Sequence, residues 1–377
     1  MSAAAPPPEP LLFLIDELEL GGSQRQILLL AKALRRKRHP VTVAYFRETG
    51  AVVRPELEAA GIDVRLVVKR RRIDPAFFLR LARLLASARG AHVLSFGYTA
   101  NFWTRLAGLA AAAPPSISCV RDLTYLPRAG GPVTRALGRF ESLLARRSRW
   151  VVANSNVTAA SVTARGLVPA GKLRVVPNAV DGTVFVPPAR ARPALRALVG
   201  GVEPEPIVGT MARLVLPKDL PTLVRAAARV AARRPEVRFL IGGEGPERAR
   251  LEALRAELGL GARVALPGTV PSRELLTGLD VALLTSSHEG MPNFVLEAMA
   301  AGVPVVSTRA GAVPEILEEG ALGRLVAVGD DAGLAEAILN SLAAPEAARA
   351  TAGRAAAAVA GLSAEAIAER YLAILRA

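Results

Sequence analysis

The stretch "VALLTSSHEGMPNFVLEAMAAGVPVVST" runs from Val281 to Thr308 and has the pattern of a strand, a loop, a helix and a second strand. Val281–Thr285 is a short apolar run, and Pro292 suits the first turn of a helix. Gly302 can end that helix before a strand at Val303–Ser307. Because parallel strands need such a crossover, this stretch predicts a parallel sheet covered by helices.

The same alternation of short apolar runs and helical patterns extends along most of the chain. In the first half, strands are expected at Leu11–Ile15, Val41–Tyr45, Asp63–Val67, His92–Phe96, Ser116–Val120, Trp150–Ala153 and Leu173–Val176. In the second half, strands are expected at Ile207–Met211, Val237–Ile241 and Val264–Leu266, in addition to those above. Helices are expected at Gln24–Arg38, Leu220–Arg234 and Glu247–Leu258.

Proline and glycine concentrate at Val186–Pro206, which predicts a linker and the entry to a second domain. At 377 residues the chain also exceeds what one core usually organises. We therefore expect an α/β protein with two doubly wound, Rossmann-like domains, at residues 1–190 and 203–362. The cleft between two such domains is the expected ligand site.

Composition excludes several classes of protein. The single cysteine, Cys119, excludes an internal disulfide framework and a cysteine-based metal cluster. Met1–Pro10 lacks the basic and apolar regions of a signal peptide. No run reaches the roughly 18 uncharged apolar residues of a spanning helix. A cytoplasmic protein, soluble or peripheral on the membrane, is expected.

The positive charge is concentrated in the first half. Residues 1–190 hold 28 Lys and Arg against 12 Asp and Glu, a net +16, and residues 191–377 hold 20 against 21, a net −1. Two clusters, Arg35–His39 and Lys69–Arg72, contribute much of it. They are either solvated helix ends or a surface for anionic lipid or an anionic acceptor. Without interleaved aromatic residues, they do not indicate nucleic-acid binding.

Three loops that follow predicted strands could bind an anion. Gly21 and Gly22 stand before a helix, where they could approach a ligand or simply form a tight turn. Arg213 and Lys218 share the loop of "GTMARLVLPKDLPTLVRA", where two cations suit a diphosphate or are merely exposed. The glycines of "FLIGGEGPERARLEAL", Gly243 among them, could approach a nucleotide or form a turn.

Glu289 and Glu297 lie seven residues apart in a segment that is otherwise nearly uncharged. Glu289 is expected at the carboxyl edge of the sheet, and Glu297 in the following helix. The amides near Asn293, Phe294 and Val295 could take phosphate oxygens at that helix start. Carboxylates accept hydrogen bonds from hydroxyls, so the pair suits a sugar nucleotide. The alternative is a capping glutamate and a helix-surface glutamate.

Six motifs together resemble the retaining glycosyltransferases of family 4, which have the GT-B fold of two Rossmann-like domains. They are "GGSQRQ", "VPNAVD", "GTMARLVLPKD", "IGGEGPERARLE", "LPGTV" and "SSHEGMPNFVLEAMAAGVPVVSTRAGAVPEIL". The resemblance implies transfer of a sugar from a nucleotide-sugar with retained anomeric configuration, no metal and no cofactor. It also implies that the terminal helix, residues 363–377, crosses back to the first domain.

The resemblance assigns roles to individual residues. Arg213 and Lys218 would hold the donor diphosphate, Glu297 the nucleotide ribose, and Glu289 the donor sugar. The catalytic candidates are thus Glu289, Arg213 and Lys218. The donor-binding candidates are Gly21, Gly22, Arg213, Lys218, Gly243, Glu289, Gly290, Asn293, Phe294, Val295 and Glu297.

The first domain departs from the family pattern in "HVLSFGYTANFW". Gly97 stands where the family often has a histidine, and Ser95 replaces its neighbour. His92 lies inside the predicted strand, which favours a structural role. The acceptor-side candidates are Gly97, Tyr98, Arg121 and Asp122.

The main hypothesis is transfer of a sugar from a UDP- or GDP-sugar to the hydroxyl of a glycan or lipid-linked acceptor. Cations and helix-start amides would stabilise the leaving diphosphate. Two alternatives stay open. One is a catalytically weak partner subunit that binds a nucleotide-sugar, and the other is a sugar-nucleotide epimerase.

Overall fold

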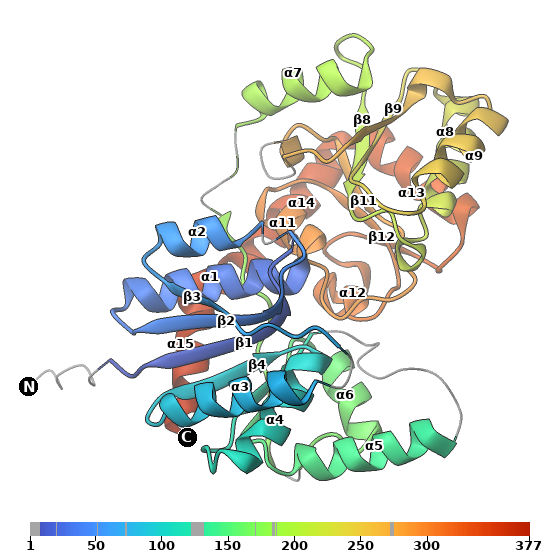
Figure 1. Ribbon diagram of the computed structural model, residues 1–377. Coiled ribbons are helices and arrows are strands. Elements are labelled where there is room, and N and C mark those ends of the chain that lie inside the picture. Colours follow the sequence, from blue (N-terminus) through green and yellow to red (C-terminus); the bar gives the residue numbers. More distant parts are fainter. Residues whose placement is uncertain are drawn as a thin grey trace, which may run out of the picture. The chain divides into compact units, whose positions relative to one another are not determined.

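The computed structural model describes residues 8–19, 21–50, 52–71, 74–121, 132–169, 171–182, 185, 187–271 and 275–377. The chain forms two compact units (Figure 1). The first unit comprises Met1–Ala179 and Leu362–Ala377, and the second comprises Val180–Gly361. The predicted domains instead end at residues 190 and 362.

The first unit contains a seven-stranded sheet in the order β3-β2-β1-β4-β5-β6-β7, with every pair parallel. Its strands are β1 (Leu11–Glu17), β2 (Val41–Arg47), β3 (Asp63–Leu66), β4 (His92–Phe96), β5 (Ile117–Val120), β6 (Trp150–Ala153) and β7 (Leu173–Val175). The strand order reverses at β1 and β4, which pair in register with Phe13 opposite Leu94. Such a reversal is where doubly wound sheets open to ligands.

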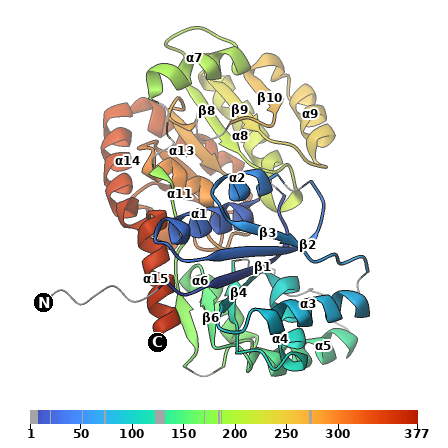
Figure 2. The same cartoon turned by 60° about the vertical axis from the view of Figure 1, so that its left-hand side comes forward.

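Helices cover both faces of this sheet. They are α1 (Gly22–Arg36), α2 (Arg54–Ala59), α3 (Pro75–Ser87), α4 (Tyr98–Ala110), α5 (Pro132–Ala145), α6 (Asn156–Ala164) and α15 (Ala364–Arg376). Phe13 and Ile15 of β1 join a core with α1 and α15, and Leu14 joins a core with α3 and α4. Figures 1 and 2 show these helix pairs on opposite faces of the sheet. Successive β1 side chains point to opposite faces, so an apolar strand fills both cores.

The second unit contains a six-stranded parallel sheet in the order β10-β9-β8-β11-β12-β13. Its strands are β8 (Ile207–Met211), β9 (Arg238–Gly242), β10 (Val264–Gly268), β11 (Val281–Leu284), β12 (Val305–Thr308) and β13 (Arg324–Val326). Its α-helices are α7 (Pro188–Val199), α8 (Leu220–Arg233), α9 (Arg248–Glu257), α11 (Asn293–Ala300), α12 (Val313–Ile316), α13 (Asp331–Ala343) and α14 (Pro345–Val359). Short 3-10 turns lie at Leu216–Lys218, Gly261–Arg263, Glu318–Gly320 and Ala360–Leu362, the last at the junction of the two units.

The predicted fold class is confirmed: both units are doubly wound parallel sheets. The strands at His92–Phe96, Trp150–Ala153 and Ile207–Met211 have the predicted bounds, and the other predicted strands differ by one to two residues at one or both ends. Gly302 adopts a φ of +66° and follows α11, as expected of a residue that ends a helix.

Two features of the second unit were predicted incorrectly. The expected linker Val186–Pro206 contains helix α7, whose Ala191, Leu195 and Val199 recur at helical spacing and are buried. A proline in the first turn is compatible with a helix, so "VPPARARP" was not a reliable sign of a linker. The strand β13 was also missed, because this edge strand has only three residues and is only partly buried.

Candidate functional site

Glu289 follows β11 at the carboxyl edge of the second sheet, where its half-buried carboxylate has two partners. Lys218 Nζ lies 2.6 Å from Glu289 Oε1. The Ser286 hydroxyl donates to the same oxygen at 2.7 Å. A cation and a buried hydroxyl on one carboxylate oxygen fix the side chain and leave Oε2 for other contacts.

The loops that carry Lys218 and Glu289 are also joined through their backbones. The Thr285 hydroxyl donates to the Lys218 carbonyl at 2.9 Å, and the Ser287 amide donates to the Pro217 carbonyl at 2.8 Å. The Thr308 hydroxyl donates to the Ser286 carbonyl at 2.7 Å. Two residues that are 71 positions apart in sequence are therefore held as one preorganised group.

A third loop, between β12 and α12, presses against Glu289. Gly311 in this loop has a φ of +55°, and a Cβ atom built there would lie 1.6 Å from the Glu289 carbonyl oxygen. Only glycine fits such an approach without displacing the backbone. The position of Glu289 thus depends on Gly311.

The glycines after β9 have a structural reason that is independent of any ligand. Gly243 has a φ of +139°, and a Cβ there would lie 1.9 Å from the Ala212 carbonyl oxygen. Gly245 stands in the same relation to Leu214, at 2.3 Å. The Leu214 amide also donates to the Glu244 carbonyl at 2.9 Å. These contacts pack the glycine-rich loop against the loop of Arg213, and the donor contact assigned to Gly243 stays a prediction.

Arg213 and Lys218 have different environments, although the sequence suggests one role for both. Arg213 is exposed, and within the part of the chain that the structure describes its side chain has no hydrogen-bond or ion-pair partner. Lys218 is paired with Glu289. Arg213 is therefore the more available cation for an incoming anion.

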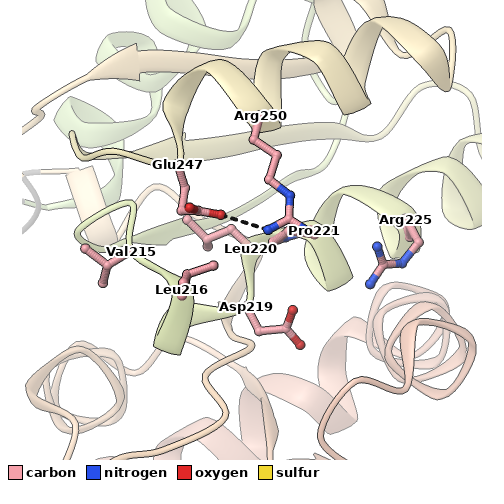
Figure 3. Close-up of a pocket in the computed structure, with 8 residues that line it drawn as sticks. All are labelled: Val215, Leu216, Asp219, Leu220, Pro221, Arg225, Glu247 and Arg250. Atoms are coloured by element: carbon pink, nitrogen blue, oxygen red, sulfur yellow. Dashed lines mark hydrogen bonds and ion pairs between the residues drawn. The ribbon is translucent and has the colours of Figure 1, made fainter.

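A pocket of about 100 Å³ lies beside this loop (Figure 3). Asp219, which adopts a left-handed conformation (φ 42°, ψ 46°), lies on one side of it, and the ion pair of Glu247 with Arg250, at 3.1 Å, on the other. Its other lining residues are Val215, Leu216, Leu220, Pro221 and Arg225. None of the predicted site residues lines it, so the expected donor site and this pocket do not coincide.

Helix α11 begins four residues after Glu289, at the same edge of the sheet. Asn293, Phe294 and Val295 form its first turn, and the half-buried Glu297 is in its second. The amides of a first helical turn point out of the helix start, which makes them suitable for phosphate oxygens. Gly290, which is buried, connects Glu289 to this turn.

In the first unit, the loop after β1 leads to a structural contact that the sequence did not predict. Gly21 is extended, with a φ of −165°, and Gly22 is the first residue of α1. Further along α1, the Gln26 side chain donates to the Ala179 carbonyl at 2.8 Å and accepts from the Ala179 amide at 2.6 Å. The motif "GGSQRQ" thereby anchors the motif "VPNAVD" at the last residues of the first unit.

Gly97, in the position of the family histidine, precedes α4 with φ 86° and ψ 169°. This region of backbone space is essentially restricted to glycine. Ser95 is fully buried and donates to the Asn101 side chain at 2.5 Å. His92 begins β4, at the amino end of the strand, and its Nε2 lies 2.8 Å from a Glu9 carboxylate oxygen. Both Ser95 and His92 thus have structural contacts, and His92 also lies at the amino end of its strand.

Arg121 is held by the first unit's own packing, and its acceptor contact stays a prediction. Its guanidinium donates to Asn178 at 2.5 Å and to the Tyr371 hydroxyl at 3.2 Å, and it lies 5.5 Å from the Phe96 ring centre. Tyr98 packs against the core beneath α6. Asp122 lies outside the described residues.

Part of the first basic cluster is paired, although Arg35 and Arg38 remain exposed. Arg36 pairs with Glu365, and Lys37 pairs with Glu369, both on α15. His39 is buried. In the second cluster, Lys69 donates to the Arg71 carbonyl at 3.0 Å. Arg72 lies outside the described residues.

Among the residues that the structure describes, none of the helices combines the length and the apolar character of a membrane-spanning segment. The same residues hold no group of three or more His, Cys, Asp or Glu side chains placed to bind a metal ion.

The sequence analysis assigned no role to Ser286, Thr308 or Gly311. The signal that could have identified them is their placement, because each lies at or just after the end of a strand of the second sheet. The carboxyl ends of parallel strands share one edge, so such residues are neighbours even when the sequence separates them.

Comparison with known proteins gives matches to both halves. The family described as "Glycosyltransferase Family 4" matches residues 20–184, and that described as "Glycosyl transferases group 1" matches residues 205–344. The lipopolysaccharide core biosynthesis glycosyltransferase LpsE of Rhizobium meliloti is 36% identical over 172 residues, 45% of this chain and 49% of LpsE. The chain thus spans about half the length of that relative.

Two further matches extend over more of the chain. The 2-deoxystreptamine glucosyltransferase of Streptomyces kanamyceticus is 30% identical over 271 residues, 67% of this chain and 69% of that protein. The structure of Anabaena HepE, solved with UDP and glucose, superposes with a TM-score of 0.84 at 23% identity, over 98% of this chain and 100% of HepE. The fold, the motifs and these matches agree, and the chain belongs to the group 1 glycosyltransferases of family 4.

Proposed function

We propose that the protein transfers a sugar from a UDP- or GDP-sugar to an acceptor hydroxyl with retention of the anomeric configuration. The observation that carries this proposal is the group formed by Glu289, Lys218 and Ser286 at the carboxyl edge of the second sheet, next to the start of α11. A carboxylate for sugar hydroxyls stands there beside cations and amides for a diphosphate.

Each residue has a chemical task in this proposal. When the bond from sugar to phosphate breaks, negative charge grows on the leaving diphosphate and positive charge on the sugar. Arg213, Lys218 and the first-turn amides of α11 stabilise the diphosphate, and preorganised charges of this kind are usually the largest catalytic contribution. Glu289 holds the donor sugar, and Glu297 holds the ribose. The acceptor hydroxyl attacks from the face that the diphosphate leaves.

The Lys218–Glu289 pair gives the site a defined resting state. Before the donor arrives, each group neutralises the other at 2.6 Å. An incoming diphosphate competes for Lys218, while Ser286 keeps its hydrogen bond to Glu289. The cations supply the charge neutralisation, so the proposed reaction uses no divalent metal and no cofactor.

The acceptor is proposed to be a glycan or a lipid-linked glycan, and the protein to work in the cytoplasm, peripherally at the inner face of a membrane. LpsE is named for lipopolysaccharide core biosynthesis, which supports this class of acceptor. The +16 charge of residues 1–190 also favours an anionic surface or acceptor.

A panel of UDP- and GDP-sugars, with and without glycan acceptors, tests the proposal by nucleotide release. Release from one donor that survives a chelator and falls in Glu289→Gln would support it, and NMR of the product would show the anomeric configuration. Tight donor binding without release, with or without an acceptor, would instead favour a nucleotide-sugar-binding partner subunit. The glycine at position 97, in place of the family histidine, is the observation behind that second candidate.

A further inference from the structure

Helix α5 presents two large apolar side chains to solvent on successive turns. Phe140 is 42% exposed and Leu143 is 58% exposed. Arg139 on the helix and Arg146 and Arg147 directly after it are exposed as well. At 100° per residue, Arg139, Phe140 and Leu143 fall within about one third of the helix circumference, and Arg146 and Arg147 follow in the turn after Ala145. We define these five residues as the α5 face.

The opposite side of α5 is firmly anchored, so its outward side is fixed. Leu144 and Ala145 are buried. Glu141 is also buried and pairs with Arg105 at 2.5 Å. At the edge of the α5 face, the half-exposed Phe140 ring contacts Phe102 of α4 edge-on, with centroids 6.1 Å apart. The helix therefore has little freedom to rotate its apolar residues inward.

Charge distinguishes the α5 face from an ordinary solvated surface. Between Pro132 and Arg147 the only acidic residue is Glu141, and it points inward to Arg105. The α5 face thus combines apolar side chains with three arginines and no carboxylate. By contrast, Arg36 and Lys37 of the first basic cluster are paired with carboxylates of α15.

We propose that the α5 face binds the interfacial region of an anionic lipid bilayer. Apolar side chains would enter the headgroup boundary while the arginines contact anionic headgroups, as in interfacial amphipathic helices. A protein partner would have to supply carboxylates around an apolar patch, whereas an anionic bilayer presents both chemistries over any area. The inference extends the proposed function, which includes a lipid-linked acceptor, but membrane binding itself requires no turnover.

Co-sedimentation with vesicles tests this inference. The probes are phosphatidylcholine vesicles with and without phosphatidylglycerol, at low and physiological salt. We expect binding only to the anionic vesicles, decreasing as salt is added. In the double variant Phe140→Ser/Leu143→Ser the partition coefficient onto anionic vesicles should fall roughly tenfold or more. The same decrease is expected for Arg139→Ser/Arg146→Ser.

Matched controls separate the α5 face from general surface effects. Val202→Ser/Val328→Ser removes apolar residues that are 67% and 44% exposed in the second unit, and it should leave binding unchanged. Arg36→Ser/Lys37→Ser removes the same amount of charge from the α15 ion pairs, and it should change binding less than the Arg139/Arg146 variant. Thermal unfolding confirms that each variant is folded.

Leu143→Trp provides a measurement that needs no loss of function. The tryptophan fluorescence of this variant is compared with that of the parent protein. Its emission maximum should shift to shorter wavelength with anionic vesicles only. No binding by the parent protein, equal binding to phosphatidylcholine alone, or full binding by Phe140→Ser/Leu143→Ser would overturn the inference. Nucleotide release from soluble donors is measured without vesicles, so these outcomes do not depend on whether the proposed function holds.

Discussion

Gly311→Ala should be one of the most damaging small substitutions for catalysis, although Gly311 touches no proposed substrate group. The added Cβ would lie 1.6 Å from the Glu289 carbonyl oxygen, and real Cβ atoms essentially never come within 3.0 Å of such an atom. The two loops must therefore separate by at least 1.4 Å, the difference between these distances. Glu289 would move with its backbone, away from Lys218 and Ser286.

The expected magnitude follows from this displacement. A misplacement of about 1 Å can cost roughly 100-fold in rate, so kcat/KM should fall by about two orders of magnitude. Stability should fall as well, because an alanine at a φ of +55° costs about 1–2 kcal/mol before any clash is counted.

Gly302→Ala is the matched control for backbone strain. Gly302 has a φ of +66°, but an added Cβ there would meet no atom within 4 Å. It should lose a similar 1–2 kcal/mol of unfolding free energy while keeping most of its activity. Chemical denaturation and nucleotide release with the best donor measure the two quantities. If Gly311→Ala matched Gly302→Ala in kcat/KM, the dependence of Glu289 on the β12–α12 loop would be wrong.

Three further predictions concern single side chains. Ser286→Ala removes one of two partners of Glu289 and should reduce kcat/KM about tenfold or more, with recovery in Ser286→Thr. Arg213→Ala and Lys218→Ala should each weaken donor binding by roughly 1.5–3 kcal/mol in calorimetry, and unchanged affinity in both would remove the diphosphate assignment. Burial raises the pKa of Cys119 from 9.0 to about 11, so the folded state keeps this proton longer than the unfolded state. Stability should therefore fall between these pH values, by roughly 2–3 kcal/mol more than in Cys119→Ala; equal denaturation curves for the two proteins would contradict this.

The fold was largely predictable because buried parallel strands are continuous apolar runs. Trp150–Ala153 and Ile207–Met211 are such runs, and both were located without error. Helix α7 was missed because its prolines mark a linker in most sequences, whereas here one of them begins a helix. The helix is indicated by the spacing of Ala191, Leu195 and Val199. Three apolar residues are a weak helical pattern in a segment that also holds two prolines and three arginines.

The site was predictable residue by residue but not as an assembly. Glu289 and Lys218 were each identified from a local motif, and their ion pair joins loops that are distant in sequence. For the first basic cluster, Arg35–His39, the local sequence was misleading. Arg36 is 329 residues from Glu365, so nothing local indicates that this arginine is paired. The local sequence shows which charged residues a surface contains. The fold decides which of them are paired with residues distant in sequence and which can bind a ligand.

The departure from the family pattern at Gly97 is fixed by the backbone. With φ 86° and ψ 169°, Gly97 lies in a region of backbone space that residues with a Cβ atom essentially do not adopt. The start of α4 depends on this geometry, because the Asn101 amide donates to the Gly97 carbonyl at 2.9 Å. The Asn101 side chain in turn connects Ser95 to the Cys119 carbonyl, at 2.5 and 3.1 Å. A Cβ atom at position 97 would meet no atom within 4 Å, so the backbone conformation, and not a lack of space, is what opposes a histidine here. A histidine would have to adopt this conformation or shift the start of α4, to which the buried network is connected.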